Sequence, residues 1–148
     1  MQKNIQTVKK IAILTSGGDA PGMNAAIRAI VIAAQHYHLE VTGFYAGFNG
    51  LIDDVSVPLG LKDVSHIIHR GGTILKSARC PAMETTLGIA QATSTLLKAQ
   101  IDALIVIGGD GSFTGLIALQ KQWSGQVIGI PGTIDNDIDG TDFTIGFS

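Results

Sequence analysis

The sequence has little cysteine, no charge excess and no long apolar run. Cys80 is its single cysteine, which excludes an internal disulfide framework and is typical of a reducing cytosol. The N-terminal MQKNIQTVKK is followed only by the short run IAILT, so we expect neither a signal peptide nor a membrane span. A net charge of −2 gives no electrostatic basis for binding nucleic acid or an anionic membrane. We therefore expect a cytoplasmic protein with no nucleic-acid or membrane partner.

Two common phosphate-binding motifs are also missing. A P-loop requires a Gly-Lys pair, and the chain contains none. A dinucleotide fingerprint requires G-x-G-x-x-G, but Gly109, Gly111 and Gly115 are spaced G-x-G-x-x-x-G, and Gly129 stands where the acidic residue is expected. A phosphate site in this chain must therefore use another arrangement.

The chain is rich in apolar residues and in glycine. Its 148 residues, 45% of them hydrophobic, fit one domain with a buried core and argue against disorder. The 19 glycines cluster at the ends of apolar runs rather than in a linker. No internal repeat or interdomain linker is evident.

Short apolar runs alternate with helical patterns along the chain. The predicted strands are 10–15, 41–46, 103–107 and 127–130. Because the first, third and fourth are almost continuously hydrophobic, we expect them to be covered on both faces. The predicted helices are 22–36, 86–99, 112–122 and a shorter one at 63–69 with Asp63 as its cap. This alternation predicts an α/β fold with a doubly wound, mostly parallel sheet and helices on both faces (Rossmann-like).

Three glycine-containing loops follow predicted strands. TSGGDAPG follows the first, GGDGS the third and PGTIDND the fourth. Ligands in such folds bind beyond the carboxyl ends of the strands. We therefore expect all three loops to lie at one edge of the sheet.

In the first loop, Gly17 and Gly18 permit a tight turn and a close approach of backbone to ligand. Pro21 suits a helix start, and the N–H groups of the helix that follows favour a phosphate. The alternative is an ordinary turn with an Asp cap.

In the second loop, Asp110 stands between Gly109 and Gly111, which leaves its carboxylate unobstructed. Mg²⁺ usually takes one or two carboxylates together with substrate phosphates. The alternative makes Asp110 a helix N-cap, with Ser112 opening the next helix.

The third loop carries Asp135 and Asp137, which point the same way if the segment is extended. One carboxylate could accept a proton from an attacking hydroxyl, and the other could hold Mg²⁺ directly or through water. Thr133 can hydrogen-bond beside them. The alternative is a solvated acidic turn.

No Lys or Arg follows Lys121, so balancing charge must come from elsewhere. Lys76 and Arg79 in GGTILKSAR, with Arg70 before them, are the candidates, because phosphoryl transfer needs cations on the phosphate oxygens. His66 and His69 are spaced i,i+3 but lack further ligands, which favours ordinary histidines over a metal pair. Cys80 has no His partner placed by the sequence, which favours a structural or site-edge role.

LTSGGDAPGMNAAIR, RGGTILKSAR, VIGGDGS and PGTIDNDIDGTDFTIGF together resemble the bacterial 6-phosphofructokinase family, from about Lys10 onward and in the same order. The resemblance implies phosphoryl transfer from MgATP to the 1-hydroxyl of fructose 6-phosphate, a glycolytic reaction that yields ADP. It implies a homotetramer.

The resemblance also implies individual roles. Asp135 would accept the proton, Arg79 would stabilise the transferring charge, and Asp110 and Asp137 would serve the metal. The remaining implied contacts are Thr133 and Ile134 to the sugar phosphate and Gly18, Cys80, Gly109, Gly111 and Ser112 to the nucleotide.

Further positions indicate which ligands the chain binds. Pyrophosphate-dependent relatives typically have Asp at the position of Gly111 and Lys at that of Gly132, so the resemblance implies ATP as donor. Arg28 matches an effector-binding arginine, but Ile32 and Leu61 stand where arginine is common and His66 where Asp is common. We expect weak or altered regulation by ADP and phosphoenolpyruvate.

Length is the larger departure, because the family is roughly twice as long. We expect residues 1–148 to be an incomplete ATP- and Mg-binding N-terminal domain, without the sugar-phosphate domain and without activity alone. The alternatives are a non-catalytic nucleotide-binding module or another kinase with a GGDG loop, of the NAD or lipid kinase type.

Overall fold

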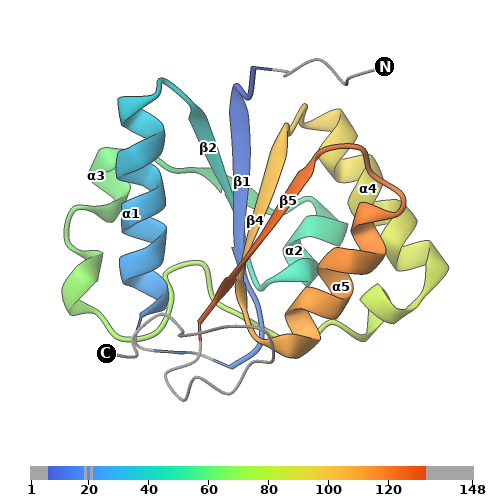
Figure 1. The fold of residues 1–148 in the computed structure, drawn as a ribbon. Helices are drawn as coiled ribbons and strands as arrows, with labels where there is room; N and C mark the ends of the chain where they lie inside the picture. Colours follow the sequence, from blue (N-terminus) through green and yellow to red (C-terminus); the bar gives the residue numbers. More distant parts are fainter. Residues whose placement is uncertain (1–6, 19, 21, 133–148) are drawn as a thin grey trace.

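The computed structural model describes residues 7–18, 20 and 22–132, and these form one sheet with helices on both faces (Figure 1). The strands are β1 (Lys10–Thr15), β2 (Glu40–Phe44), β3 (Ser56–Pro58), β4 (Ala103–Gly108) and β5 (Gln126–Pro131). The α-helices are α1 (Met23–His36), α2 (Phe48–Asp53), α3 (Leu61–Val64), α4 (Thr86–Lys98) and α5 (Asp110–Gln120). Two 3₁₀ turns, η1 (Ile67–His69) and η2 (Pro81–Glu84), complete the elements.

The strand order β3-β2-β1-β4-β5 confirms the doubly wound fold. β1 pairs in parallel with both β2 and β4, and β4 pairs in parallel with β5. From β1 the chain builds outward through β2 on one side and through β4 and β5 on the other. The strand order therefore reverses between β1 and β4, and this is where ligands bind in open α/β sheets.

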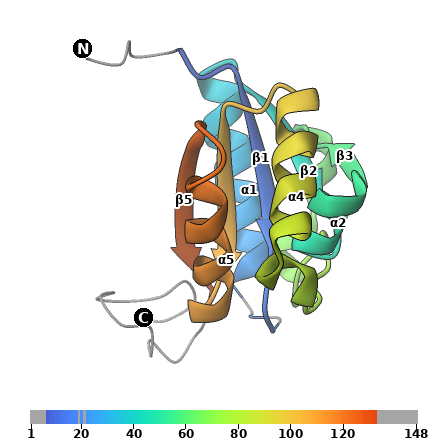
Figure 2. The same cartoon turned by 90° about the vertical axis from the view of Figure 1, so that its right-hand side faces the viewer.

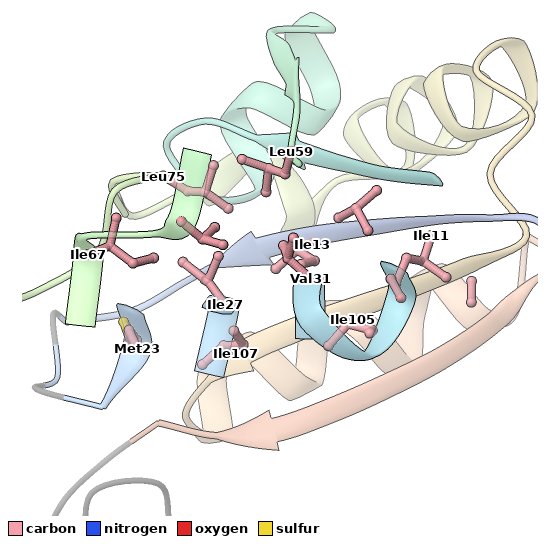
Figure 3. Close-up of a cluster of buried hydrophobic side chains, with 14 of the residues drawn as sticks. Ile11, Ile13, Met23, Ile27, Val31, Leu59, Ile67, Leu75, Ile105 and Ile107 are labelled. Carbon is pink, nitrogen blue, oxygen red and sulfur yellow. The ribbon is translucent and has the colours of Figure 1, made fainter. Parts of the chain in front are cut away.

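Alternate side chains of the central strand enter two different cores. Ile11 and Ile13 of β1 pack in the cluster beneath α1, whereas Ala12 and Leu14 pack in the cluster beneath α2, α4 and α5. Figure 3 shows the first cluster, and Figure 2 shows α1 and α5 on opposite sides of the sheet. Because every residue of β4 is buried as well, the predicted coverage of both faces is confirmed for β1 and β4.

β5 differs from its prediction. Its burial is incomplete, and Ile128 is 43% exposed. Within the described residues β5 is an edge strand, and a Cβ on Gly129 would lie only 2.9 Å from the Phe113 ring of α5. One face of β5 is covered by α5. Among the described residues, the other face contacts the α1 cluster only through partly buried Ile130, so the prediction that both faces of β5 are covered is wrong.

Short elements account for the remaining differences. β3, α2 and η2 were not predicted, and the single helix expected at 63–69 is wrong, because α3 and η1 are separate. Asp63 is not the N-cap. It lies in the first turn of α3, where its carboxylate accepts a hydrogen bond of 2.7 Å from the backbone N–H of Gly60.

The three longer helices agree with prediction within two residues at each end, and α5 ends at Gln120 rather than at residue 122. α5 begins at Asp110 rather than Ser112, so Ser112 lies inside its first turn. Among the helices of the described residues, none combines the length and apolar character that a membrane crossing requires.

Candidate functional site

Backbone hydrogen bonds join the ends of β1, β4 and β5. The N–H of Ser16, just after β1, donates to the carbonyl of Ile107 at 2.9 Å. The N–H of Gly132, just after β5, donates to the carbonyl of Gly108 at 2.9 Å. The predicted convergence of the loops is therefore confirmed for 16–18, 108–112 and the start of the third loop.

Ser112 lies where the first two loops meet. A Cβ on Gly108 would lie 2.5 Å from the Ser112 hydroxyl and 2.6 Å from the carbonyl oxygen of Ser16. A Cβ on Gly17 would lie 3.6 Å from the same hydroxyl, and Gly17 has a φ of +87°, which glycine adopts without strain. The close approach of β1 and α5 thus requires glycine at 108, and Ser112 is buried beneath it.

The space in front of these loops is open. A Cβ on Gly18, Gly109 or Gly111 would meet no described heavy atom within 4 Å. The N-caps of α1 and α5 are Gly22 and Gly109, and neither helix has a side-chain cap. Free N–H groups and the positive end of the helix dipole at these N-termini favour a bound anion such as a phosphate.

Asp110 presents an exposed carboxylate at this edge. It is the first residue of α5, and Gly109 is the N-cap, so the alternative role of Asp110 as N-cap is wrong. Among the described residues, its carboxylate forms no hydrogen bond or ion pair. One free carboxylate beside an anion site suits Mg²⁺, which takes few protein ligands when phosphates supply the others.

Residues 70–79, here called the cation segment, carry Arg70, Lys76 and Arg79, and all three are exposed. The segment passes beside the end of β1. A Cβ on Gly47 would lie 3.0 Å from the carbonyl oxygen of Thr15 and 3.5 Å from that of Ala78. This proximity brings the predicted cations to the edge of the sheet where a phosphate is expected to bind.

Cys80 follows the cation segment and is half-buried. Burial raises the pKa of its thiol, and the charge of Asp53 adds to that rise, while backbone hydrogen bonds from Met83 and Ala82 oppose it. A protonated thiol is a poor nucleophile, which supports a structural or site-edge role.

His66 and His69 are both exposed, and η1 includes only His69. Within the described ranges, no three His, Cys, Asp or Glu side chains gather as a metal site.

Arg28 lies in α1, in its second turn. Its Nε is buried and has no hydrogen-bond partner among the described residues. Ile32, one turn later, is 40% exposed, and Leu61 at the start of the neighbouring α3 is 46% exposed.

Several predicted residues lie outside the described part of the chain. These are Pro21, Thr133, Ile134, Asp135 and Asp137. Sequence reasoning also missed Thr15, Asn24 and Thr73, three buried polar residues whose side chains hydrogen-bond at or within the cation segment. Only their polarity within apolar surroundings could have signalled them.

The chain is similar in sequence to a known family of proteins. A model of the Phosphofructokinase family matches residues 10–148. ATP-dependent 6-phosphofructokinase of Haemophilus ducreyi is 55% identical over 140 residues, covering 95% of this chain and 43% of that protein. The enzyme of the same name from Caldanaerobacter subterraneus is 54% identical, covering 95% of this chain and 44% of that protein.

Solved structures share the fold. The crystal structure of Pichia pastoris phosphofructokinase in the T-state has a TM-score of 0.87 and 41% identity, covering 99% of this chain and 17% of that one. Pyrophosphate-dependent phosphofructokinase from Marinobacter aquaeolei has a TM-score of 0.79 at 19% identity, covering 92% of this chain and 36% of that one, and shows the fold alone.

This chain spans less than half the length of the curated relatives it matches, 43% and 44% in the two cases above. The family model nevertheless extends from β1 to the last residue, and more than half of the aligned residues are identical in those relatives. The chain belongs to the phosphofructokinase family.

Proposed function

We propose that this chain is the ATP- and Mg²⁺-binding part of an ATP-dependent 6-phosphofructokinase. The observation that carries the proposal is the convergence of Gly17, Gly108 and Ser112 between β1 and β4, with uncapped N-termini of α1 and α5. Membership of the family, and relatives named ATP-dependent 6-phosphofructokinase, support the reaction. The complete enzyme transfers the γ-phosphoryl group of ATP to the 1-hydroxyl of fructose 6-phosphate.

The proposed site residues have separate roles in the phosphoryl transfer. The sugar hydroxyl oxygen forms a bond to the γ-phosphorus, the bond from that phosphorus to the bridging oxygen of ADP breaks, and Asp135 takes the hydroxyl proton. Arg79 offsets charge on the transferring phosphoryl oxygens. Thr133 and Ile134 contact the sugar phosphate.

The nucleotide phosphates lie against Gly18 and the backbone of 109–112, with Cys80 at the edge of the nucleotide. Asp110 would hold Mg²⁺ with Asp137 in support, and the ion would supply positive charge that offsets the charge of the phosphates. The free carboxylate of Asp110 beside open space supports this assignment.

ATP is the proposed donor rather than pyrophosphate. Gly111 borders open space, which leaves room for the α-phosphate of a nucleotide. Gly132 is more confined, because a Cβ there would lie 3.2 Å from Met23 Cε and 3.3 Å from Ile107 Cγ2. A lysine at 132 would require those neighbours to move.

Regulation and assembly are proposed as well. We assign Arg28 to an effector site, supported by its buried Nε, for which no partner exists among the described residues. We expect this site to bind ADP and phosphoenolpyruvate weakly or in an altered way, because it lacks the usual charged residues at the positions of Ile32, Leu61 and His66. The complete enzyme is proposed to be a cytoplasmic homotetramer, and residues 1–148 to be the incomplete first domain.

Calorimetry of the purified chain with ATP tests the proposal. We expect binding that requires Mg²⁺ and weakens at least about tenfold in Asp110→Asn, since charged hydrogen-bond and metal contacts exceed about 1.4 kcal/mol. Magnesium-dependent binding that Asp110→Asn leaves unchanged would contradict the metal assignment. Mg·ATP binding by a complete protein that never phosphorylates fructose 6-phosphate would favour a non-catalytic nucleotide-binding module.

A further inference from the structure

The cation segment contains no helix or strand, so contacts from other elements must fix its shape. It lies between η1, which ends at His69, and η2, which begins at Pro81. Lys76 within it has a φ of +61°, an uncommon conformation for a residue with a side chain. Leu75 anchors the segment in the α1 cluster (Figure 3), and its carbonyl accepts a hydrogen bond from Ala46 N–H at 2.9 Å.

Two buried threonines connect the segment to the end of β1. The Thr15 hydroxyl donates to the carbonyl of Lys76 at 2.9 Å and lies 3.0 Å from the Thr73 hydroxyl. Because the single proton of Thr15 goes to Lys76, Thr73 must donate to Thr15. Thr73 in turn accepts a hydrogen bond of 3.1 Å from Leu75 N–H. The pair therefore fixes the backbone over residues 73–76.

Asn24 holds the beginning of the same segment. It lies in the first turn of α1 and is 1% exposed. Its Nδ2 donates to the carbonyl of Arg70 at 3.1 Å, and its Oδ1 accepts from Ile74 N–H at 2.8 Å. One side chain thus joins the N-terminus of α1, where the phosphate is expected, to the segment that carries Arg79.

The other end of the segment is held by α2. Asn49 Nδ2 donates to the carbonyl of Arg79 at 2.9 Å. The backbone on both sides of Lys76 is thereby fixed, while the Lys76 and Arg79 side chains remain exposed. A rigid backbone with free cationic side chains is what accurate placement of a charged group requires.

We propose that Thr15, Thr73 and Asn24 are positioning residues that hold the cation segment so that Arg79 reaches the phosphates. This inference rests on the proposed role of Arg79 at the nucleotide. The residues do not touch the ligand. They act through the backbone of 70–76, because a misplacement of about 1 Å is enough to weaken an aligned charge contact severely.

Thr95 provides a matched control. It is 6% exposed, against 0% for Thr15 and 7% for Thr73. Among the described residues its hydroxyl bonds only within its own helix α4, to the carbonyl of Gln91 at 3.1 Å. Thr→Val at these three positions therefore removes a buried hydroxyl each time, but only two of the changes release the cation segment.

The first test is Mg·ATP affinity in a double-mutant cycle with Arg79→Ala, using the 148-residue chain. We expect Thr15→Val and Thr73→Val to weaken binding about tenfold alone and less than about twofold in the Arg79→Ala background, as for residues coupled through one partner. Thr15→Ser should restore affinity, and Thr95→Val should leave it unchanged. Equal weakening in both backgrounds, or no weakening, would overturn the proposal.

Amide hydrogen exchange over residues 74–80 separates this inference from the proposed function. Thr15→Val and Thr73→Val should accelerate exchange there, whereas Thr95→Val should not. If the wild-type chain fails to bind Mg·ATP, the proposed function fails, and exchange alone decides whether these residues fix the segment. Unchanged exchange in both variants would refute the proposal that these threonines hold the cation segment, even if Mg·ATP binds. Thr73→Val serves if Thr15→Val does not fold.

Discussion

Glycines at the same edge of the sheet differ in the room around them. Gly108 is enclosed by Ser112 and Ser16, whereas Gly109 and Gly111 face open space. The enclosed glycine permits the strands and α5 to approach, and the open ones leave volume for a ligand. Substitutions at these positions should therefore separate folding from binding.

Gly111→Asp should abolish tight Mg·ATP binding without destabilising the chain. A new carboxylate near the phosphates costs about 1–4 kcal/mol at short range, which corresponds to a loss in affinity of about fivefold to several hundredfold. Gly111→Ala is the size control and should retain binding, with a thermal midpoint no lower than wild type, because Ala favours helices. A Gly111→Asp chain that binds Mg·ATP normally would remove nucleotide phosphates from this position.

The raised pKa of Cys80 predicts slow alkylation at neutral pH. Iodoacetamide reacts with the thiolate, so the native chain should react more slowly than the same chain unfolded in urea, and the difference should persist until the pH passes the raised pKa. The folded state holds its thiol proton longer, so this group lowers stability as the pH rises above the unfolded value. Faster reaction in the native chain would contradict this account.

At the scale of elements, helix α4 depends on a single side-chain cap. The Thr85 hydroxyl accepts a hydrogen bond of 3.0 Å from Gly88 N–H, and Gly88 could not carry a Cβ because the Ala82 carbonyl occupies that space. α4 packs on α2 and contributes Ala92 and Leu96 to the core. The start of α4 is therefore fixed by local chemistry as well as by packing.

Thr85→Ala should destabilise the chain by about 0.5–2 kcal/mol, the usual cost of losing an N-cap. Thr93→Ala is the control in the same helix, since the Thr93 hydroxyl only bonds back to the carbonyl of Ile89. That change should be nearly neutral, because Ala has the higher helix propensity. Urea denaturation measures both, and an equal loss for the two variants would exclude a capping role.

The long, strongly patterned elements could be predicted from the sequence, because the spacing of their apolar residues indicates which side of each element is buried. α1, α4, β1 and β4 were predicted within two residues at each end. β3 could not, since its three residues form a strand only by pairing with β2. α2 follows Gly47, whose φ of +63° turns the chain, and its six residues are too few to show a helical period.

The site was predictable to the same degree. The predicted topology placed the glycine loops at one edge of the sheet. Asp110 remains a candidate metal ligand, because Gly109 rather than Asp110 is the N-cap of α5. The contact between Thr15 and Thr73 joins residues 58 positions apart, so no local pattern could indicate it. Asp135 and Asp137 lie beyond the described residues, and their roles stay predictions.

At the scale of the whole molecule, the residues proposed above for binding the nucleotide outnumber those proposed for binding the sugar phosphate. It spans 43% or 44% of the length of the relatives compared above. At one edge of its sheet lie open helix N-termini, the exposed carboxylate of Asp110 and the cation segment, all of which we propose to serve the nucleotide. The proposed sugar contacts are confined to residues 133–135.

The 148-residue chain should therefore form no fructose 1,6-bisphosphate from fructose 6-phosphate and Mg·ATP. A coupled assay at high protein concentration, with a bacterial 6-phosphofructokinase as positive control, measures this. Turnover above background that scales with the concentration of the chain would show that it needs no further domain.

The most direct measurement of the central claim is an amide NMR titration of the isotopically labelled chain with Mg·ATP. We expect shift changes at the carboxyl ends of β1 and β4, over Gly17, Gly18 and 108–112, and little change at the amino ends of the same strands near Lys10 and Ala103. Changes confined to the amino ends, or no changes at saturating Mg·ATP, would contradict it.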